Sequence, residues 1–400
     1  MRFDLTDTAF CESAATWLAG LNDENLRDLE VVFAISPGYY PTTLHRLWQV
    51  EVSRRGLSPR MAARFSQSGK RIPVCHPHDC DWRFTTDTAA ELVDRVASHL
   101  EQPGCIAHIG TPSTFRAGLS LHPQHRHVLL ERNAAMTAAL ADDAAEVVTL
   151  DLALHDPPKL KANAAILDPP WYVHDTLIFL WAASRVCHHG TLIWLCQPTL
   201  ATRPGIAEER MELLGELFQL GFEEVHTFDH AVRYQMPHFE AMSLRLTATE
   251  LAVPPNWRKG DLLVLRKVGP ASITRPLAVS EQWTEVHFGP VRIKLRATDQ
   301  VEDLANLVPD DVLSTVSRRD PVRGKIGLWT SGNRVYGLAA PERVGRLITL
   351  CDNDLEAMRF TLARTLLHAR RLGMSTSTAR QLFDVLLVEL QEHNTWKDSV

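Results

Sequence analysis

The tetrapeptide Asp168-Pro169-Pro170-Trp171 contains the residue types in this chain best suited to chemistry. It follows an apolar run at residues 164–167 that is typical of a short buried strand. The two prolines cannot continue that strand, because each lacks an N–H donor and has a fixed φ. The chain must therefore leave the sheet at the carboxyl end of the strand, where open α/β sheets bind ligands. A carboxylate, a rigid turn and a flat ring together suit a site that holds a planar amine for reaction.

Other candidate site residues follow three earlier strands of the same predicted sheet. Gly110 lies in the loop after the first strand, whereas Glu131 and Asp151 end the second and third strands. An acidic residue about twenty positions past the glycine is where such sheets hydrogen-bond a ribose diol. The loop has a single glycine, so the G-x-G-x-x-G fingerprint is absent. Because the carboxyl ends of parallel strands meet at one edge, these residues and Asp168 predict a nucleoside site.

An alternation of strands and helices from about residue 85 predicts the sheet that positions these residues. The expected strands are 105–109, 126–130, 146–150, 164–167, 191–196, 224–228 and 242–247, and the expected helices are 85–100, 133–140, 176–187 and 209–220. This order indicates an α/β fold with a doubly wound, mostly parallel sheet.

The chain is long enough for two or three domains. An α-rich segment is expected at 1–84, with helices over 1–30 and 41–68 and a strand over 30–35. The α/β domain is expected at 85–250, because Pro254-Pro255 marks a boundary. An α+β module is expected at 251–400, with strands 262–266, 284–288, 291–295 and 325–330 and helices 342–372 and 375–393.

Composition favours a cytoplasmic protein. The seven cysteines are odd in number and scattered, which fits reduced thiols better than a disulfide framework. No signal peptide is visible, and no apolar run approaches the roughly 18 residues that a membrane span needs. Nothing in the sequence sets the oligomeric state.

The charge is unevenly distributed along the chain. The formal net charge is −6, whereas residues 251–350 contain 15 Lys and Arg against 10 Asp and Glu. Arg292, Lys294 and Arg296 alternate along an expected strand and therefore share one face. We hypothesise that this basic face binds nucleic acid or an acidic protein partner.

The run Cys75-His76-Pro77-His78-Asp79-Cys80 has the residue types of a zinc site but not the spacing. Adjacent ligands with a proline between them rarely converge on one ion, so no metal site is predicted. The following residues, 81–84, are expected to form a wall beside the sheet, with Arg83 in an internal salt bridge.

Asp168-Pro169-Pro170-Trp171 resembles the catalytic motif of amino-methyltransferases that use S-adenosylmethionine. The wider stretch, about 100–247, looks most like the N6-adenine methyltransferase-like family, some of whose eukaryotic relatives modify protein lysine. The resemblance implies a Rossmann-like methyltransferase domain with S-adenosyl-L-methionine as the cofactor.

The resemblance also implies a role for each site residue. The loop with His108, Gly110 and Pro112 would border the cofactor, with Gly110 under its methionine part. Glu131 would lie on the ribose and Asp151 near the adenine. The catalytic residues would be Asp168, Pro169, Pro170 and Trp171. The Asp168 carboxylate and the Pro169 carbonyl would accept hydrogen bonds from the target amine, and Asp168 would also border the cofactor. Trp171 would stack on the target base.

The predicted function is therefore methyl transfer to an amine, with adenine N6 in nucleic acid as the favoured acceptor. Two alternatives stay open. One is a protein lysine methyltransferase, which the negative net charge favours. The other is a catalytically inactive scaffold, because the cofactor loop has one glycine and Pro112 stiffens it.

Overall fold

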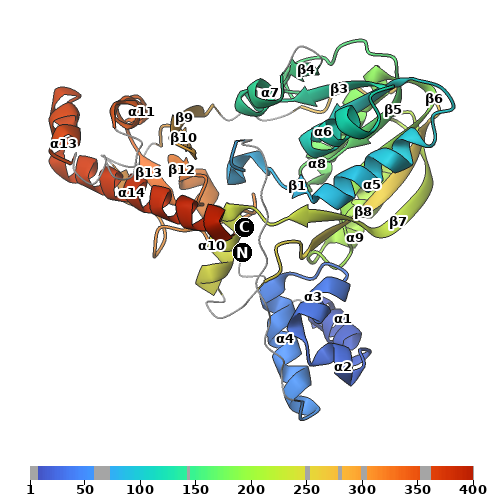
Figure 1. Cartoon of the computed structure of the whole chain (residues 1–400), viewed down its shortest axis with the longest axis horizontal. Helices are drawn as coiled ribbons and strands as arrows, with labels where there is room; N and C mark the ends of the chain where they lie inside the picture. Colours follow the sequence, from blue (N-terminus) through green and yellow to red (C-terminus); the bar gives the residue numbers. More distant parts are fainter. Residues whose placement is uncertain are drawn as a thin grey trace.

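The computed structural model of the protein describes residues 8–57, 73–141, 145–247, 253–277, 282–298, 304–351 and 362–399. Figure 1 shows a large central sheet with its helices, a small helical group at one end and a second α+β group beside the sheet. No helix in these ranges is both long enough and apolar enough to cross a membrane.

The N-terminal segment is mainly helical, as predicted, but residues 30–35 do not form a strand. Its helices are α1 (Thr8–Ala19), α2 (Asp23–Leu26), α3 (Leu29–Ile35) and α4 (Pro41–Arg54). The strand expected over 30–35 is wrong because Asp28 caps a helix there, accepting hydrogen bonds from the N–H groups of Glu30 and Val31. The last part of the helix expected over 41–68 lies outside the described residues.

The central sheet has eight strands in the order β1-β7-β8-β6-β5-β2-β3-β4. Their bounds are β1 (Arg83–Phe84), β2 (Cys105–Ile109), β3 (Arg126–Glu131), β4 (Glu146–Thr149), β5 (Ala162–Leu167), β6 (Cys187–Pro198), β7 (Phe222–Gln235) and β8 (Arg258–Lys267). Strands β4, β3, β2, β5 and β6 are parallel, and β8 pairs antiparallel with both β6 and β7. The predicted α/β fold with a mostly parallel sheet is confirmed.

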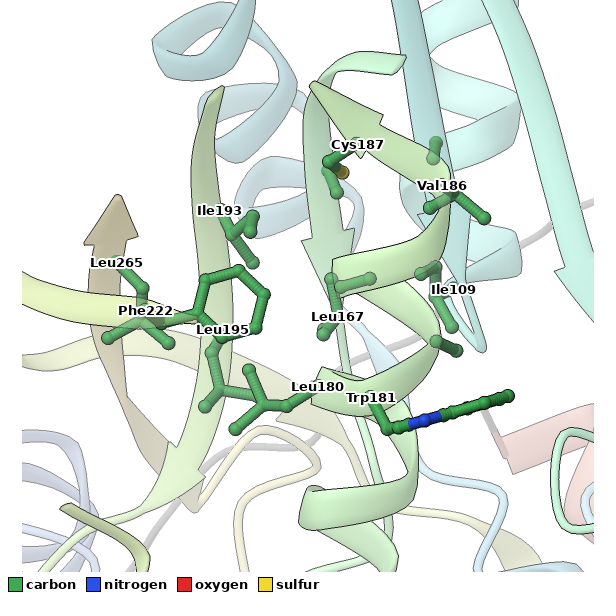
Figure 2. Packing of buried hydrophobic residues seen from close by; sticks show 14 of the residues in the cluster. Ile109, Leu167, Leu180, Trp181, Val186, Cys187, Ile193, Leu195, Phe222 and Leu265 are labelled. Atoms are coloured by element: carbon green, nitrogen blue, oxygen red, sulfur yellow. The ribbon is translucent and has the colours of Figure 1, made fainter. Parts of the chain in front are cut away.

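Helices pack on both faces of this sheet, so it is doubly wound. They are α5 (Thr86–Ala97), α6 (Pro112–Leu121), α7 (Ala134–Leu140), α8 (Val173–Val186) and α9 (Ile206–Glu216). Helix α10 (His238–Thr247) packs with the N-terminal helices instead. Along β5, Ala165 and Leu167 join the core beneath α8, whereas Ala164 and Ile166 join the core beneath α5. Figure 2 shows the first of these cores, with Leu167 near α8. The buried strand that precedes the Asp-Pro-Pro-Trp motif is therefore fixed from both sides.

Two predicted strands were wrongly assigned around the Pro254-Pro255 boundary. Residues 242–247 are part of helix α10, because β8 occupies the position beside β7 that a strand there would need. Residues 262–266 belong to β8 in the central sheet and not to the C-terminal module. Both assignments depend on strand pairing between segments distant in sequence, which the local hydrophobic pattern does not reveal.

The C-terminal residues form a separate antiparallel sheet with helices, as expected. The strand order is β11-β13-β12-β10-β9, with β9 (Thr284–Phe288), β10 (Val291–Leu295), β11 (Leu304–Asn306), β12 (Leu328–Thr330) and β13 (Val335–Leu338). Helices α11 (Pro341–Leu350), α13 (Leu362–Arg371) and α14 (Thr376–Ser399) contribute to the hydrophobic core beside this sheet.

Candidate active site

The predicted site residues gather at the carboxyl edge of the parallel strands. The strand order reverses between β2 and β5, and the loops that follow these two strands lie side by side. The Asp168 N–H donates to the Ile109 carbonyl at 3.3 Å. Open α/β sheets bind ligands at such a switch point. A cavity of about 240 Å³ lies here.

Gly110 has a left-handed backbone, with φ of +64°. A Cβ at this position would lie 2.8 Å from Cε1 of Phe179, so a side chain is excluded by contact as well as by φ. Pro112 follows as the first residue of α6, where its missing N–H costs nothing and its fixed φ suits the helix. Pro112 is therefore compatible with this loop. Helix α6 itself was not predicted from the sequence.

Glu131 and Asp151 line the same cavity as Gly110 and Pro112. The Asn133 N–H donates to one Glu131 carboxylate oxygen at 2.8 Å, and burial raises the pKa of Glu131 to about 7. Asp151 accepts a hydrogen bond from the Ala153 N–H at 2.9 Å. The apolar lining between these carboxylates comes from Met136, Leu150, Leu152, Ile178 and Phe179. Carboxylates that flank an apolar wall fit a nucleoside, which has ribose hydroxyls and a flat purine.

The carboxyl group of Asp168 lines the cavity and, among the described residues, has one hydrogen-bond partner. The hydroxyl of Tyr234 donates to its Oδ1 at 2.7 Å. Burial raises the pKa of Asp168 to about 8, although the Tyr234 hydrogen bond and the nearby Arg258 charge oppose this shift. A carboxyl group with such a pKa changes its charge near neutral pH and can accept a proton from an amine.

Trp171 is packed among aromatic and cationic neighbours. Its ring meets that of Tyr234 edge to face, with centroids 5.4 Å apart at 85°. The Arg258 guanidinium carbon lies 4.2 Å from the Trp171 centroid and 4.0 Å from that of Trp82. Arg258 therefore contacts both indoles and covers one face of the Trp171 ring.

His108 is not part of the cavity lining. It is fully buried on β2, where its ring nitrogens are 2.9 Å from the Thr114 hydroxyl and 3.0 Å from Nδ1 of His127. It is the last but one residue of β2, and its side chain points into the core between the sheet and α6. The prediction that His108 borders the cofactor is therefore wrong.

The predicted basic face is not an open surface. Arg292 is 1% exposed and pairs with Glu285 and with Asp79, whose Oδ2 lies 2.5 Å away. Lys294 also pairs with Asp79. Arg296 donates to the Ile326 carbonyl at 2.7 Å. Because Arg292 and Lys294 are neutralised by carboxylates and Arg296 is held by backbone carbonyls, the hypothesis that the three form an open nucleic-acid surface is wrong.

Asp79 instead joins the C-terminal sheet to the segment before β1. It lies in the short helix η1 (Pro77–Asp79) and contacts Arg292, Lys294 and Arg132. Burial alone would raise the pKa of Asp79, but His78 and these three cations hold it well below its usual range. His76 is buried nearby, 3.0 Å from the Trp329 carbonyl. The Cys75–Cys80 run therefore connects the C-terminal sheet to the loop after β3.

The C-terminal module also supplies part of the cavity wall, from Thr315 to Ser317. The Arg318 N–H donates to the Tyr172 hydroxyl at 2.9 Å, and its guanidinium pairs with Asp175. Arg319 pairs with Glu209 at 2.5 Å. These contacts place residues 315–317 across the site from the sheet edge.

Several cavity residues could not be found from the sequence. Tyr234 and Arg258 face each other in the β7–β8 pairing, and Glu240 follows on α10. No sequence motif identifies Tyr234, Arg258 or Glu240. Because residues 242–247 and 262–266 were assigned to the wrong elements, the sequence did not place these three residues at the cavity. The wall expected from residues 81–84 is partly present, because Asp81 and Trp82 line the cavity. Arg83 makes the predicted internal salt bridge, at 2.8 Å from Asp81.

No family model matches this sequence, and no curated protein is similar to it. Solved structures do match the fold. The branched-chain polyamine synthase from Thermus thermophilus, in complex with N4-aminopropylspermidine and 5′-methylthioadenosine, is 13% identical with a TM-score of 0.51. The match covers 68% of this chain and 90% of that chain.

Weaker matches come from methyltransferases. A putative RNA methyltransferase from Pyrococcus horikoshii is 15% identical with a TM-score of 0.36, over 50% of this chain and 93% of that one. A putative methyltransferase from Bacillus halodurans is 13% identical with a TM-score of 0.31, over 45% and 99%. At these identities the likeness shows the fold alone: the chain shares the α/β fold of the Thermus thermophilus synthase.

Proposed function

We propose that this protein is an S-adenosylmethionine-dependent methyltransferase that acts on an amine. The observation that carries the proposal is the position of Asp168: its carboxyl lines the same cavity as Gly110, Glu131 and Asp151. This arrangement combines an amine-binding group with the carboxylates and apolar wall that suit a nucleoside. The cofactor would supply an electrophilic methyl group on its sulfonium.

The chain's own residues would align the acceptor. Tyr234 donates to Oδ1 of Asp168, which leaves Oδ2 to accept a hydrogen bond from the amine. Pro169 and Pro170 line the cavity, and the Pro170 carbonyl accepts the Tyr172 N–H at 2.7 Å, which closes the turn that fixes Asp168. Holding reactants at near-attack distance supplies roughly 7–11 kcal/mol at best, so positioning is the main contribution expected here.

Adenine N6 is the acceptor predicted from the motif, and Trp171 in the cavity wall supports it. A base in a duplex would have to flip out to reach this depth. The pairing of Arg292 and Lys294 with acidic residues removes the surface expected to hold nucleic acid.

An aliphatic amine, such as protein lysine, is the second candidate, and Asp168 favours it. Such an amine is protonated at neutral pH and must lose a proton before it can attack. A carboxyl group with a pKa of about 8 is able to take that proton once it is ionised. The amino group of adenine needs no such step.

Transfer of labelled methyl from S-adenosylmethionine tests the proposal. Single-stranded and duplex oligonucleotides, lysine peptides and small amines would be supplied as acceptors to wild type and to Asp168→Asn. Label on any amine that depends on Asp168 supports the proposal and identifies the class. A protein that binds the cofactor but labels none of these acceptors would favour the inactive scaffold.

A further inference from the structure

Arg258 occupies an unusual place in the cavity. It begins β8, which runs antiparallel to β6, so Arg258 lies at the carboxyl edge of the parallel strands. It pairs in register with Tyr234, the partner of Asp168. Trp82 and Trp171 hold its guanidinium from two sides, at 4.0 and 4.2 Å. Attraction between the cation and the two ring faces holds the guanidinium in place.

The charge of Arg258 is not neutralised within the described part of the chain. Arg132 and Arg203, which also line the cavity, pair with Asp79 and with Glu209. Arg258 forms neither a hydrogen bond nor a salt bridge with any described residue, and its buried Nε has no partner there. Arg258 is half-buried, and a partly desolvated guanidinium without an anion is costly because its desolvation is not offset.

Glu240 is the acidic neighbour of Arg258, but it does not pair with it among the described residues. Glu240 is 3% exposed, and its Oε1 has no hydrogen-bond partner in that part of the chain. Burial raises the pKa of Glu240, and the Arg258 charge partly opposes that shift. The two groups therefore interact at a distance, and the guanidinium still lacks an anion in contact with it.

We propose that Arg258 is the anchor of a carboxylate-binding subsite in this cavity. A planar guanidinium held between two rings matches a carboxylate, which it can bind with two parallel hydrogen bonds. A phosphate dianion fits less well, because Arg258 is a single cation beside Asp168 and Glu240. The proposal rests on the proposed function, and the carboxylate has two sources: the methionine end of the cofactor or the acceptor.

The first experiment distinguishes the cofactor as the source. S-adenosylmethionine and its decarboxylated form would be titrated by calorimetry into wild type, Arg258→Gln and Arg258→Lys. These ligands differ only in the carboxylate. If the cofactor supplies it, wild type binds the carboxylate form at least about tenfold more tightly, as expected for a charged hydrogen-bonded pair. Arg258→Gln reduces this preference to within about twofold, whereas Arg258→Lys keeps part of it.

The second experiment tests the acceptor as the source. Binding of 4-aminobutyrate and of its neutral amide would be compared by saturation-transfer NMR, with and without saturating S-adenosylhomocysteine. A preference for the carboxylate that Arg258→Gln removes assigns the subsite to the acceptor. Arg203→Gln is the matched control, because that cavity arginine is already paired with Glu209. It should leave either preference unchanged.

The outcomes separate this inference from the proposed function. Equal binding of both cofactor forms, together with equal binding of the acid and the amide, overturns the subsite while leaving the cofactor site intact. A preference that Arg203→Gln removes as fully as Arg258→Gln also overturns it. Failure of every adenosyl ligand to bind argues against the proposed function, and the NMR comparison without cofactor then decides the subsite independently.

Discussion

Asp79 and Asp168 line the same cavity, but their surroundings differ in charge. Asp79 contacts three cationic side chains, and its pKa is held well below the usual range. The Asp168 carboxyl accepts a hydrogen bond from the Tyr234 hydroxyl, and burial raises its pKa to about 8. The comparison shows that burial alone does not define a reactive carboxyl. Asp79 is an ionised structural junction, whereas Asp168 can exchange a proton near neutral pH.

Replacing Asp79 tests the structural side of this comparison and has the largest expected effect. Asp79→Ala leaves Arg292 and Lys294 buried with less opposing charge, so the free energy of unfolding should fall by about 3–5 kcal/mol. Denaturant unfolding measures it. Arg126→Ala, which breaks an exposed pair with Glu146, is the control and should cost less than about 1 kcal/mol. Equal losses would contradict the assignment of Asp79.

Replacing Asp168 tests the reactive side. Asp168→Asn keeps the shape of the side chain but removes the carboxylate acceptor, so methyl transfer should slow by about 10²–10⁴-fold. Cofactor affinity should change little, because the carboxyl faces the amine in the proposed arrangement. Single-turnover rates at saturating cofactor measure the loss. A variant with more than half of the wild-type rate would exclude Asp168 from the reaction.

The pH profile sharpens the same contrast. If ionised Asp168 is the active form, kcat/KM should rise with pH and level off above about 8. The Tyr234 hydroxyl stabilises the ionised form, so Tyr234→Phe should move that rise to higher pH and lower the rate by about tenfold at neutral pH. Leu263→Val, a conservative change elsewhere on β8, should leave the profile in place. A profile that is flat from pH 6 to 9 would contradict the role of Asp168.

Thermal unfolding gives the smallest expected effect. The raised pKa means that folding binds a proton at Asp168, so this group destabilises the fold as pH rises from about 4 toward 8. Asp168→Asn removes that dependence. Its Tm should exceed that of wild type by a few degrees at pH 8 and by less at pH 5. A lower Tm at pH 8 would show that the carboxylate is stabilised there.

The sequence was most informative where structure follows local rules. Gly110, Glu131, Asp151 and Asp168 each end or follow a parallel strand, and parallel strands bring their carboxyl ends to one edge. That these four residues meet at one cavity could therefore be predicted from the alternating pattern of strands and helices; their contact with a cofactor stays a prediction. The prediction that His108 borders the cofactor was wrong because its side chain points from β2 into the core.

The acceptor half could not be predicted in the same way. Tyr234 and Arg258 meet through the antiparallel pairing of β7 and β8, which depends on contacts between distant segments. Arg292 and Lys294 alternate on a strand as predicted, but a distant aspartate covers that face. Spacing places residues on a face, but it does not show which other segment packs against that face.

Calorimetric titration of S-adenosylmethionine and S-adenosylhomocysteine into wild type, Glu131→Ala and Asp168→Asn tests the proposed cofactor site most directly. Wild type should bind both ligands, and Glu131→Ala should weaken their binding by about 10–100-fold, as expected for loss of a charged hydrogen bond. Asp168→Asn should bind them nearly as wild type does. Absence of binding to folded wild type, or equal binding by Glu131→Ala, would contradict the proposed cofactor site.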